Sequence, residues 1–239
     1  MSAAVVDYWK IRHRKETTST NADAREGSPG DVFTADFQSA GRGRLAHKWV
    51  SPSGANLLMS AVLGVAGLPV ETAALLPLVA GLAVLRGIEP FARGRTVQIK
   101  WPNDVFVDGK KVCGILCERH GDNVIAGIGV NVRAQKFPDD IRCRATFIGG
   151  SATVEAVRDV VLGRLYDYFQ KLATEGFSLI YGELSAVDYL KGRAVTVRQT
   201  DDDSAPVSGL CGGIAADGSL DVGGVRIYAG EAHVEEVEG

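Results

Sequence analysis

A lysine at the mouth of a hairpin is well placed for chemistry on an anion. Lys111 closely follows Asp108 and Gly109, and an Asp-Gly pair between apolar runs is a strong hairpin signal because a type I′ turn needs positive φ at both positions. A Trp-Pro-Asn-Asp loop at 101–104 precedes the hairpin, and a third strand ends in Gly-Ile-Gly-Val-Asn at 127–131. The cation, the amide, the carboxylate and the glycine backbone predict an anion-binding site.

A glycine- and arginine-bearing loop at 38–49 is the second such segment. Its Gly-x-Gly-x-x-Ala pattern at 41–46 superficially matches a dinucleotide-binding fingerprint, but that fingerprint requires a helix directly afterwards. Ser-Pro-Ser-Gly at 51–54 follows instead, so we reject a Rossmann site. Arg42 and Arg44 offer planar forks for phosphate or carboxylate. Taken alone, the loop could also be a solvated turn.

A third polar run, Thr-Ser-Thr-Asn at 18–21, precedes a helix that must be short because Gly-Ser-Pro-Gly at 27–30 ends it. Capping alone would explain these residues.

Apolar periodicity predicts the elements that carry these segments. We expect an edge strand at 9–15, strands at 32–37 and 56–65, one helix that is led by 69–72, has Leu75 on its apolar face and ends by 87–90, a meander at 97–132 and a helix capped by Thr153. Short strands with glycine-rich turns follow at 194–198, 207–214, 220–225 and 227–237, typical of a small barrel or sandwich. We place a boundary near Val187, between domains 1–186 and 187–239.

Composition narrows the class of protein. A net charge of −3 and a pI near 5.8 argue against nucleic acid or an anionic membrane as the main partner. The most apolar run, 73–85, is too short to span a bilayer. Four cysteines in no dense disulfide pattern, and no secretory signal, lead us to expect the cytoplasm.

A metal site at Cys113, Cys117 and His120, with Cys143 as a distant fourth ligand, is the weaker interpretation. The spacing is not that of a zinc knuckle, and both strand cysteines share one face as small buried hydrophobes would. We predict no metal ligands among the site residues.

Three motif groups stand in one order along the chain. They are STN at 19–21; QSAGRGR at 38–44 with KWVSP at 48–52 and GANL at 54–57; and KWPND at 100–104 with KVCGIL at 111–116 and GIGVN at 127–131. Together they resemble the catalytic domain of the biotin protein ligases across about residues 16 to 132. The segment after Leu190 resembles that family's small SH3-like domain.

The resemblance implies an α/β (α+β) fold, with a mixed, largely antiparallel sheet flanked by helices, of the biotin/lipoate ligase and class II synthetase-like type, and a C-terminal SH3-like β-barrel. It implies an ATP-dependent ligase that makes biotinyl-5′-AMP, with Mg²⁺ accompanying ATP, and transfers biotin to a lysine of a biotin carboxyl carrier protein of acetyl-CoA carboxylase or a related carboxylase. We expect a monomer or homodimer. The helix-turn-helix of bifunctional repressors is not found, so we expect no operator binding.

The resemblance also assigns roles to residues. Those resembling the biotin site are Ser19, Thr20, Asn21, Gln38, Gly41, Arg42, Gly43, Arg44, Lys111, Gly114, Gly127 and Gly129. Those resembling the nucleotide site are Trp49, which would stack on adenine, Lys100, Asn103, Asp104 and Asn131. The catalytic set is Lys111, on the biotin carboxylate and then the acyl phosphate, with Arg42, Arg44 and Asp104. Asp104 would orient or deprotonate the carrier lysine, or simply form an Asx turn.

Two departures and two alternatives remain open. Many relatives continue Arg-Gly-Arg where this chain has Leu45-Ala46-His47, and the helix after Asn21 is shorter than usual. A lipoate or octanoate ligase, or a non-catalytic biotin-binding module, would share the fold.

Strict strand alternation puts Lys111 and Gly114 on opposite faces, although the family pattern sends both towards the ligand. Either a bulge intervenes, or Gly114 matters through its missing side chain.

Overall fold

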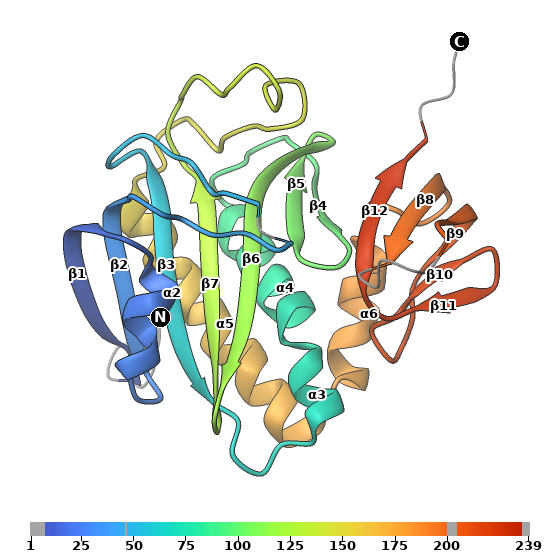
Figure 1. Ribbon diagram of the computed structural model, residues 1–239, viewed down its shortest axis with the longest axis horizontal. Coiled ribbons are helices and arrows are strands. Elements are labelled where there is room, and N and C mark those ends of the chain that lie inside the picture. The colour runs from blue at the N-terminus through green and yellow to red at the C-terminus, as the bar shows by residue number, and fades with distance from the viewer. Residues whose placement is uncertain (1–7, 46, 200–204, 236–239) are drawn as a thin grey trace.

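The site is carried by a seven-stranded sheet of order β1-β2-β3-β7-β6-β5-β4 (Figure 1). The structure is a computed structural model that describes residues 8–45, 47–199 and 205–235. The strands are β1 (Lys10–Thr17), β2 (Asp31–Gln38), β3 (Asn56–Gly64), β4 (Val97–Lys100), β5 (Asp104–Val107), β6 (Lys110–His120) and β7 (Asn123–Asn131). Only β1 and β2 pair in parallel among these neighbours. The predicted mixed, largely antiparallel sheet is confirmed.

Helices cover one face of this sheet. They are α3 (Val70–Ala74), α4 (Leu76–Ile88), α5 (Val154–Glu175) and α6 (Ser178–Ala186), with α4 against the sheet and α5 packed on α4 (Figure 1). A Cβ on Gly81 of α4 would lie 3.7 Å from Ile115, so odd-numbered Ile115 faces the helices and its neighbour Gly114 faces away. The opposite face receives α2 (Thr20–Asp23) and the 3₁₀ turn η1 (Ala24–Glu26). That face holds the site.

The prediction of a single helix between 69–72 and 87–90 is wrong, because the chain breaks at Leu75 between α3 and α4, although α4 ends at Ile88 as expected. Pro77 lies in the first turn of α4, where a missing N–H leaves no helical hydrogen bond unmade. The cap predicted at Thr153 is confirmed, since its hydroxyl accepts from the Ala156 N–H at 3.1 Å.

The central hairpin contains a bulge. Its turn has positive φ at both Asp108 (50°) and Gly109 (75°), as predicted. The pairing of β5 with β6 then slips by one residue, so that Val112 is the extra residue of β6. The slip returns Lys111 to the face of Gly114, where an added Cβ would lie 3.2 Å from Lys111 Cε. The bulge alternative is therefore confirmed.

A five-stranded antiparallel sheet of order β11-β10-β9-β8-β12 forms the C-terminal part. Its strands are β8 (Ala194–Gln199), β9 (Val207–Ile214), β10 (Leu220–Val222), β11 (Val225–Ile227) and β12 (Gly230–Val234). The strands predicted at 220–225 and 227–237 are wrong in their limits. Gly223 and Gly224 both adopt positive φ and turn the chain between β10 and β11, and residues 236–237 lie outside the described ranges.

The two sheets are joined near the end of β4. Ile99 pairs with Asp188, and the Trp101 indole N–H donates to the Gly218 carbonyl at 3.1 Å. Asp188 in turn accepts from the N–H of Leu190 at 2.9 Å. Across the described ranges, no helix has the length and apolar character needed to cross a membrane.

Candidate active site

The end of the site beside α2 is a buried network of amides and hydroxyls. Gln38 Oε1 accepts from the Thr20 N–H at 2.8 Å, and its contact with Thr20 Oγ1 is 3.1 Å. Ser60 Oγ on β3 lies 2.8 Å from Thr20 Oγ1 and 2.6 Å from Asn21 Oδ1. Because Ser60, Thr20 and Asn21 are buried, these groups can recognise a small polar ring by hydrogen bonding at low dielectric.

Ser19 is the N-cap residue directly before α2, and its carbonyl accepts from the Ala22 and Asp23 N–H groups. Its buried side chain makes no capping hydrogen bond within the described residues. The explanation of this run by capping alone is therefore wrong, whereas the predicted short helix is confirmed.

Bare backbone on β7 forms the floor of the site. A Cβ on Gly127 would collide with Asn21 Oδ1, and one on Gly129 would lie 2.6 Å from Trp49 Cε2. Glycine thus lets Asn21 and the Trp49 indole lie directly against the sheet. The buried Trp49 Nε1 finds no hydrogen-bond partner among the residues that the structure describes, which leaves a donor for a ligand.

Cations outnumber carboxylates at the other end of the site. Lys111 Nζ lies 2.8 Å from Asp104 Oδ1 and 6.0 Å from the centre of a Trp49 ring. Burial lowers the pKa of Lys100 and of Arg44, and the Asp104 carboxylate partly opposes that shift in both. Three cations around Asp104, with Glu231 as a weaker second opposing charge, make this end attractive to a further anion.

Arg44 is held from two directions. One of its terminal nitrogens donates to Asn103 Oδ1 at 3.3 Å and to the Gly230 carbonyl of β12 at 3.2 Å. Asn103 is itself fixed, because its Nδ2 donates to the Ile115 carbonyl at 2.7 Å. The C-terminal sheet therefore contributes backbone to the position of a predicted catalytic arginine.

Asn131 has both ends of its amide engaged by the protein. Its Nδ2 donates to the Thr146 carbonyl at 3.0 Å, and its Oδ1 accepts from Asn56 Nδ2 at 3.1 Å. The Lys111 N–H donates to the Arg144 carbonyl at 2.8 Å. Asn131 thus anchors the segment 144–146, which pairs with Lys111 at the predicted nucleotide site.

The structure does not bring Arg42 to the Lys111 cluster. Its guanidinium donates to Glu118 Oε1 at 2.6 Å, nearer the α2 end. Gly41 and Gly43 shape its loop: the Gly41 carbonyl accepts from the Trp49 N–H at 3.0 Å, and the Gly43 N–H donates to a carbonyl at 2.7 Å.

The altered stretch after Arg44 is only partly described. Leu45 is exposed with φ of 50°, and His47 Nε2 lies 3.9 Å from Glu231 Oε2. Ala46 lies outside the described residues.

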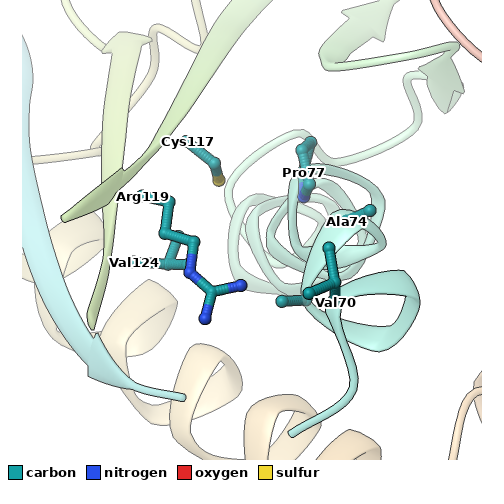
Figure 2. A pocket seen from close by; sticks show the side chains of 7 residues that line it. Val70, Ala74, Pro77, Cys117, Arg119 and Val124 are labelled. Atoms are coloured by element: carbon teal, nitrogen blue, oxygen red, sulfur yellow. The ribbon is translucent and has the colours of Figure 1, made fainter. Parts of the chain in front are cut away.

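A hollow of about 930 Å³ lies along this loop and is lined by 37–45, 47–51 and Leu116. A smaller one of about 280 Å³ lies on the helix face, where Arg119 extends from β6 towards Val70 of α3 (Figure 2). Burial raises the pKa of the Cys117 thiol there to about 12, so it stays protonated at neutral pH. The larger hollow is the one beside the predicted site residues.

A sequence model of the biotin/lipoate A/B protein ligase family matches residues 11–134. The chain belongs to this family. It is 37% identical over 184 residues to the bifunctional ligase/repressor BirA of Bacillus subtilis, and this match covers 72% of the present chain and 56% of that protein. It is 35% identical over 158 residues to the biotin--[acetyl-CoA-carboxylase] ligase of Mycobacterium tuberculosis, and this match covers 63% of the present chain and 59% of that protein. The chain thus spans just over half the length of these curated relatives.

The fold agrees with a solved member of the family. The biotin protein ligase from Aquifex aeolicus in complex with biotin and ATP superimposes with a TM-score of 0.84 at 30% identity, covering 95% of this chain and 99% of that one. We call the described part of the glycine- and arginine-bearing loop, residues 38–45 and 47–49, the glycine loop. In this ligase-family fold, the glycine loop, α2 and the central hairpin of the present chain converge on one face of the sheet.

Two residues that contact the predicted site residues, Ser60 and Glu118, were not among those predicted from the sequence. Ser60 is the one hydroxyl inside the apolar run of β3, and a lone polar residue in a buried strand is a signal for a hydrogen-bonded role. Glu118 lies near the end of β6 and carried no comparable signal. In the described ranges, no three His, Cys, Asp or Glu side chains gather as a metal site would need.

Proposed function

We propose that this chain is a biotin protein ligase, which uses ATP to activate biotin as biotinyl-5′-AMP and then transfers biotin to a lysine of a biotin carboxyl carrier protein. The observation that carries the proposal is the bipartite site: a buried amide and hydroxyl network lies at one end and a cation cluster at the other. The former suits a polar ureido ring, and the latter suits a carboxylate meeting a phosphate. The named relatives support biotin as the substrate.

In the first step, the biotin carboxylate attacks the α-phosphate of ATP and pyrophosphate leaves. Two anions must approach each other, so fixed positive charge should supply most of the acceleration. Lys111, Lys100 and Arg44 are candidates because they surround one carboxylate, Asp104. Lys111 would leave Asp104 for the biotin carboxylate.

In the second step, the carrier lysine attacks the acyl carbon and AMP leaves. The amine must lose a proton, and Asp104 becomes available to orient it or accept that proton when Lys111 turns to the acyl phosphate. Gly41, Gly43 and the arginines between and after them would shield the mixed anhydride from water. Trp49, with its indole N–H and flat ring, is the candidate contact for adenine.

Mg²⁺ is proposed only as the companion of ATP. Asp104 is engaged by Lys111, and the described residues hold no carboxylate cage. Mg²⁺ commonly binds through substrate phosphates with few protein ligands, which fits this donor set.

The remaining assignments are proposals of the same kind. Residues 1–186 would form the catalytic domain and 187–239 the small SH3-like domain. The four cysteines are free, which suits a reducing cytoplasm. The carrier would belong to acetyl-CoA carboxylase or a related carboxylase, and the ligase would act as a monomer or homodimer.

The test is to incubate the protein with biotin, ATP, Mg²⁺ and an apo biotin carrier domain, and to weigh the carrier by mass spectrometry. We expect one biotin added at one lysine, and no addition without ATP. A carrier lysine mutated to arginine is the matched control. If the protein adds lipoate or octanoate to a lipoyl domain and adds no biotin to the carrier, it is a lipoate or octanoate ligase. Tight biotin binding without adenylate formation would point to a non-catalytic module.

A further inference from the structure

Glu118 is a carboxylate that the proposed function leaves without a role, yet both of its oxygens are engaged at the site. Oε1 accepts from Arg42 of the glycine loop at 2.6 Å, and Oε2 accepts from Asn21 Nδ2 at 2.7 Å. Its side chain is 22% exposed, and Arg25 lies farther off at 3.9 Å. Glu118 therefore bridges two parts of the site that are distant in sequence.

The contact with Asn21 fixes which way that amide points. Asn21 Nδ2 faces Glu118 Oε2 and the Leu116 carbonyl, at 2.7 and 3.4 Å, and both can only accept. Asn21 Oδ1 lies 2.6 Å from the Ser60 hydroxyl and is directed at Gly127 on the floor of the site. A flipped amide would set two oxygens against each other at Glu118, so the carboxylate keeps an acceptor at this end of the pocket.

The contact with Arg42 fixes one part of the glycine loop. Arg44, two residues further on, is held at the other end of the site by Asn103 and the Gly230 carbonyl. The loop is thus fastened at both ends of the pocket. A charge-assisted hydrogen bond of 2.6 Å is among the stronger contacts available to a half-exposed arginine.

We propose that Glu118 is a positioning residue that orients the Asn21 amide for the ring of the ligand and, through Arg42, latches the glycine loop over it. The proposal rests on the proposed function only in naming biotin as the ligand. Arg42 would then act mainly as a latch, and the charge for the phosphate would come from Lys111, Lys100 and Arg44. An N–H donor on the ligand, as in a ureido ring, is the group that Asn21 Oδ1 selects.

The electrostatics agree with a charged Glu118. Burial would raise the pKa of Glu118, but the hydrogen bonds from Asn21 and Arg42, and the charges of Arg42 and Arg25, hold it below its ordinary value. The latch is therefore formed at neutral pH.

The latch is tested without ligand by limited trypsin digestion of the full chain. Glu118→Gln keeps the volume but removes the charge, and we expect cleavage after Arg44 and Lys48 to be about tenfold faster, in line with weakening a charge-assisted hydrogen bond. Arg25→Ala, which removes only the 3.9 Å contact, and Glu175→Gln on the helix layer are controls expected to cleave like wild type. An unchanged cleavage rate in Glu118→Gln overturns the latch.

A second variant guards against a folding defect in Glu118→Gln. Arg42→Ala removes the other partner from an exposed position and should accelerate cleavage after Arg44 and Lys48 as much. The double variant should be no faster than either single one. Additive effects of the two changes would contradict a shared contact.

The orientation of Asn21 is tested by biotin-dependent exchange of pyrophosphate into ATP. We expect Glu118→Gln to raise KM for biotin about tenfold, again the size of one charge-assisted contact, with KM for ATP within about twofold of wild type. Equal changes in both constants would reduce Glu118 to a general structural role and overturn the proposal. If wild type shows no exchange with biotin, the proposed function fails, and the trypsin comparison still decides the latch.

Discussion

At the scale of single residues, Lys111, which we propose acts on the biotin carboxylate, is paired with a carboxylate of the protein. Its ammonium lies 2.8 Å from Asp104 Oδ1, and its side chain is 36% exposed. The lysine is therefore neutralised yet accessible, and under the proposed function a substrate carboxylate would exchange with Asp104. Removing Lys111 takes away a charge at the anion site and leaves Asp104 without its closest partner.

We expect Lys111→Ala to lower the rate of adenylate formation by about 10²–10³-fold, the usual effect of removing one preorganised electrostatic contact. Lys110→Ala is the matched control, because Lys110 is the exposed neighbour at the start of β6. Single-turnover formation of biotinyl-AMP measures both. A Lys111→Ala enzyme within a few fold of wild type would remove this lysine from the chemistry.

The lowered pKa of Glu118 predicts how its contribution to stability depends on pH. A carboxyl whose pKa is lower in the folded state stabilises above its unfolded pKa, about 4.3 for glutamate, and that stability is lost as the pH falls through the folded pKa. The Tm difference between wild type and Glu118→Gln should thus stay constant from about pH 7 to 5 and shrink only in more acidic solution. A difference that vanished already near pH 6 would show that the carboxylate is not held in its charged form.

At the scale of elements, β7 presents two glycines on one face, and each lies under a different part of the site. An added Cβ meets Asn21 at Gly127 and the Trp49 ring at Gly129. We expect Gly127→Ala to raise KM for biotin mainly, by about tenfold or more. The resemblance assigns Gly129 to the biotin site, but its closeness to Trp49 leads us to expect Gly129→Ala to raise KM for ATP mainly, by a similar factor. Steady-state kinetics with each substrate varied provides the measurement, and each variant is the control for the other. The same pattern in both variants would contradict the division of the site.

Much of the sheet could be predicted because its signals are local. The Asp108-Gly109 turn depends on backbone conformations that few residues adopt, and the apolar runs of β3 and β7 are long enough to be read directly. Strand alternation and the family motif disagreed about the faces of Lys111 and Gly114, and a bulge was one of the two explanations predicted from the sequence. The pairing of β5 with β6 places that bulge at Val112.

Other features depend on contacts that no local pattern contains. The break at Leu75 lies within a continuous apolar periodicity, and the glycines at 223 and 224 divide a run that reads as one strand. The role proposed for Glu118 depends on its contacts with Asn21 and Arg42, which are 97 and 76 residues away in the sequence. The roles assigned to the site residues stay predictions.

At the scale of the whole molecule, the site is completed by the C-terminal sheet. The start of β12 supplies the carbonyl of Gly230 to Arg44, and Glu231 lies near both Arg44 and His47. The loop that would cover the ligand is thus supported from outside the seven-stranded sheet. Changes in the C-terminal sheet should therefore affect how the proposed site holds the adenylate.

A substitution at the start of β12 tests this support. A Cβ on Gly230 would lie 2.6 Å from the Arg198 carbonyl of β8, so Gly230→Ala must shift the strand and, with it, the carbonyl that Arg44 uses. We expect adenylate to leave this variant about three- to tenfold faster than wild type, because one hydrogen bond to a charged group is weakened. Gly209→Ala in the same sheet is the control, since its Cβ would come no nearer than 3.4 Å to any neighbouring atom and should release adenylate normally. Release is measured by trapping free biotinyl-AMP after rapid gel filtration. Equal release from both variants, with Gly230→Ala still folded, would show that the small sheet does not hold the loop through Arg44.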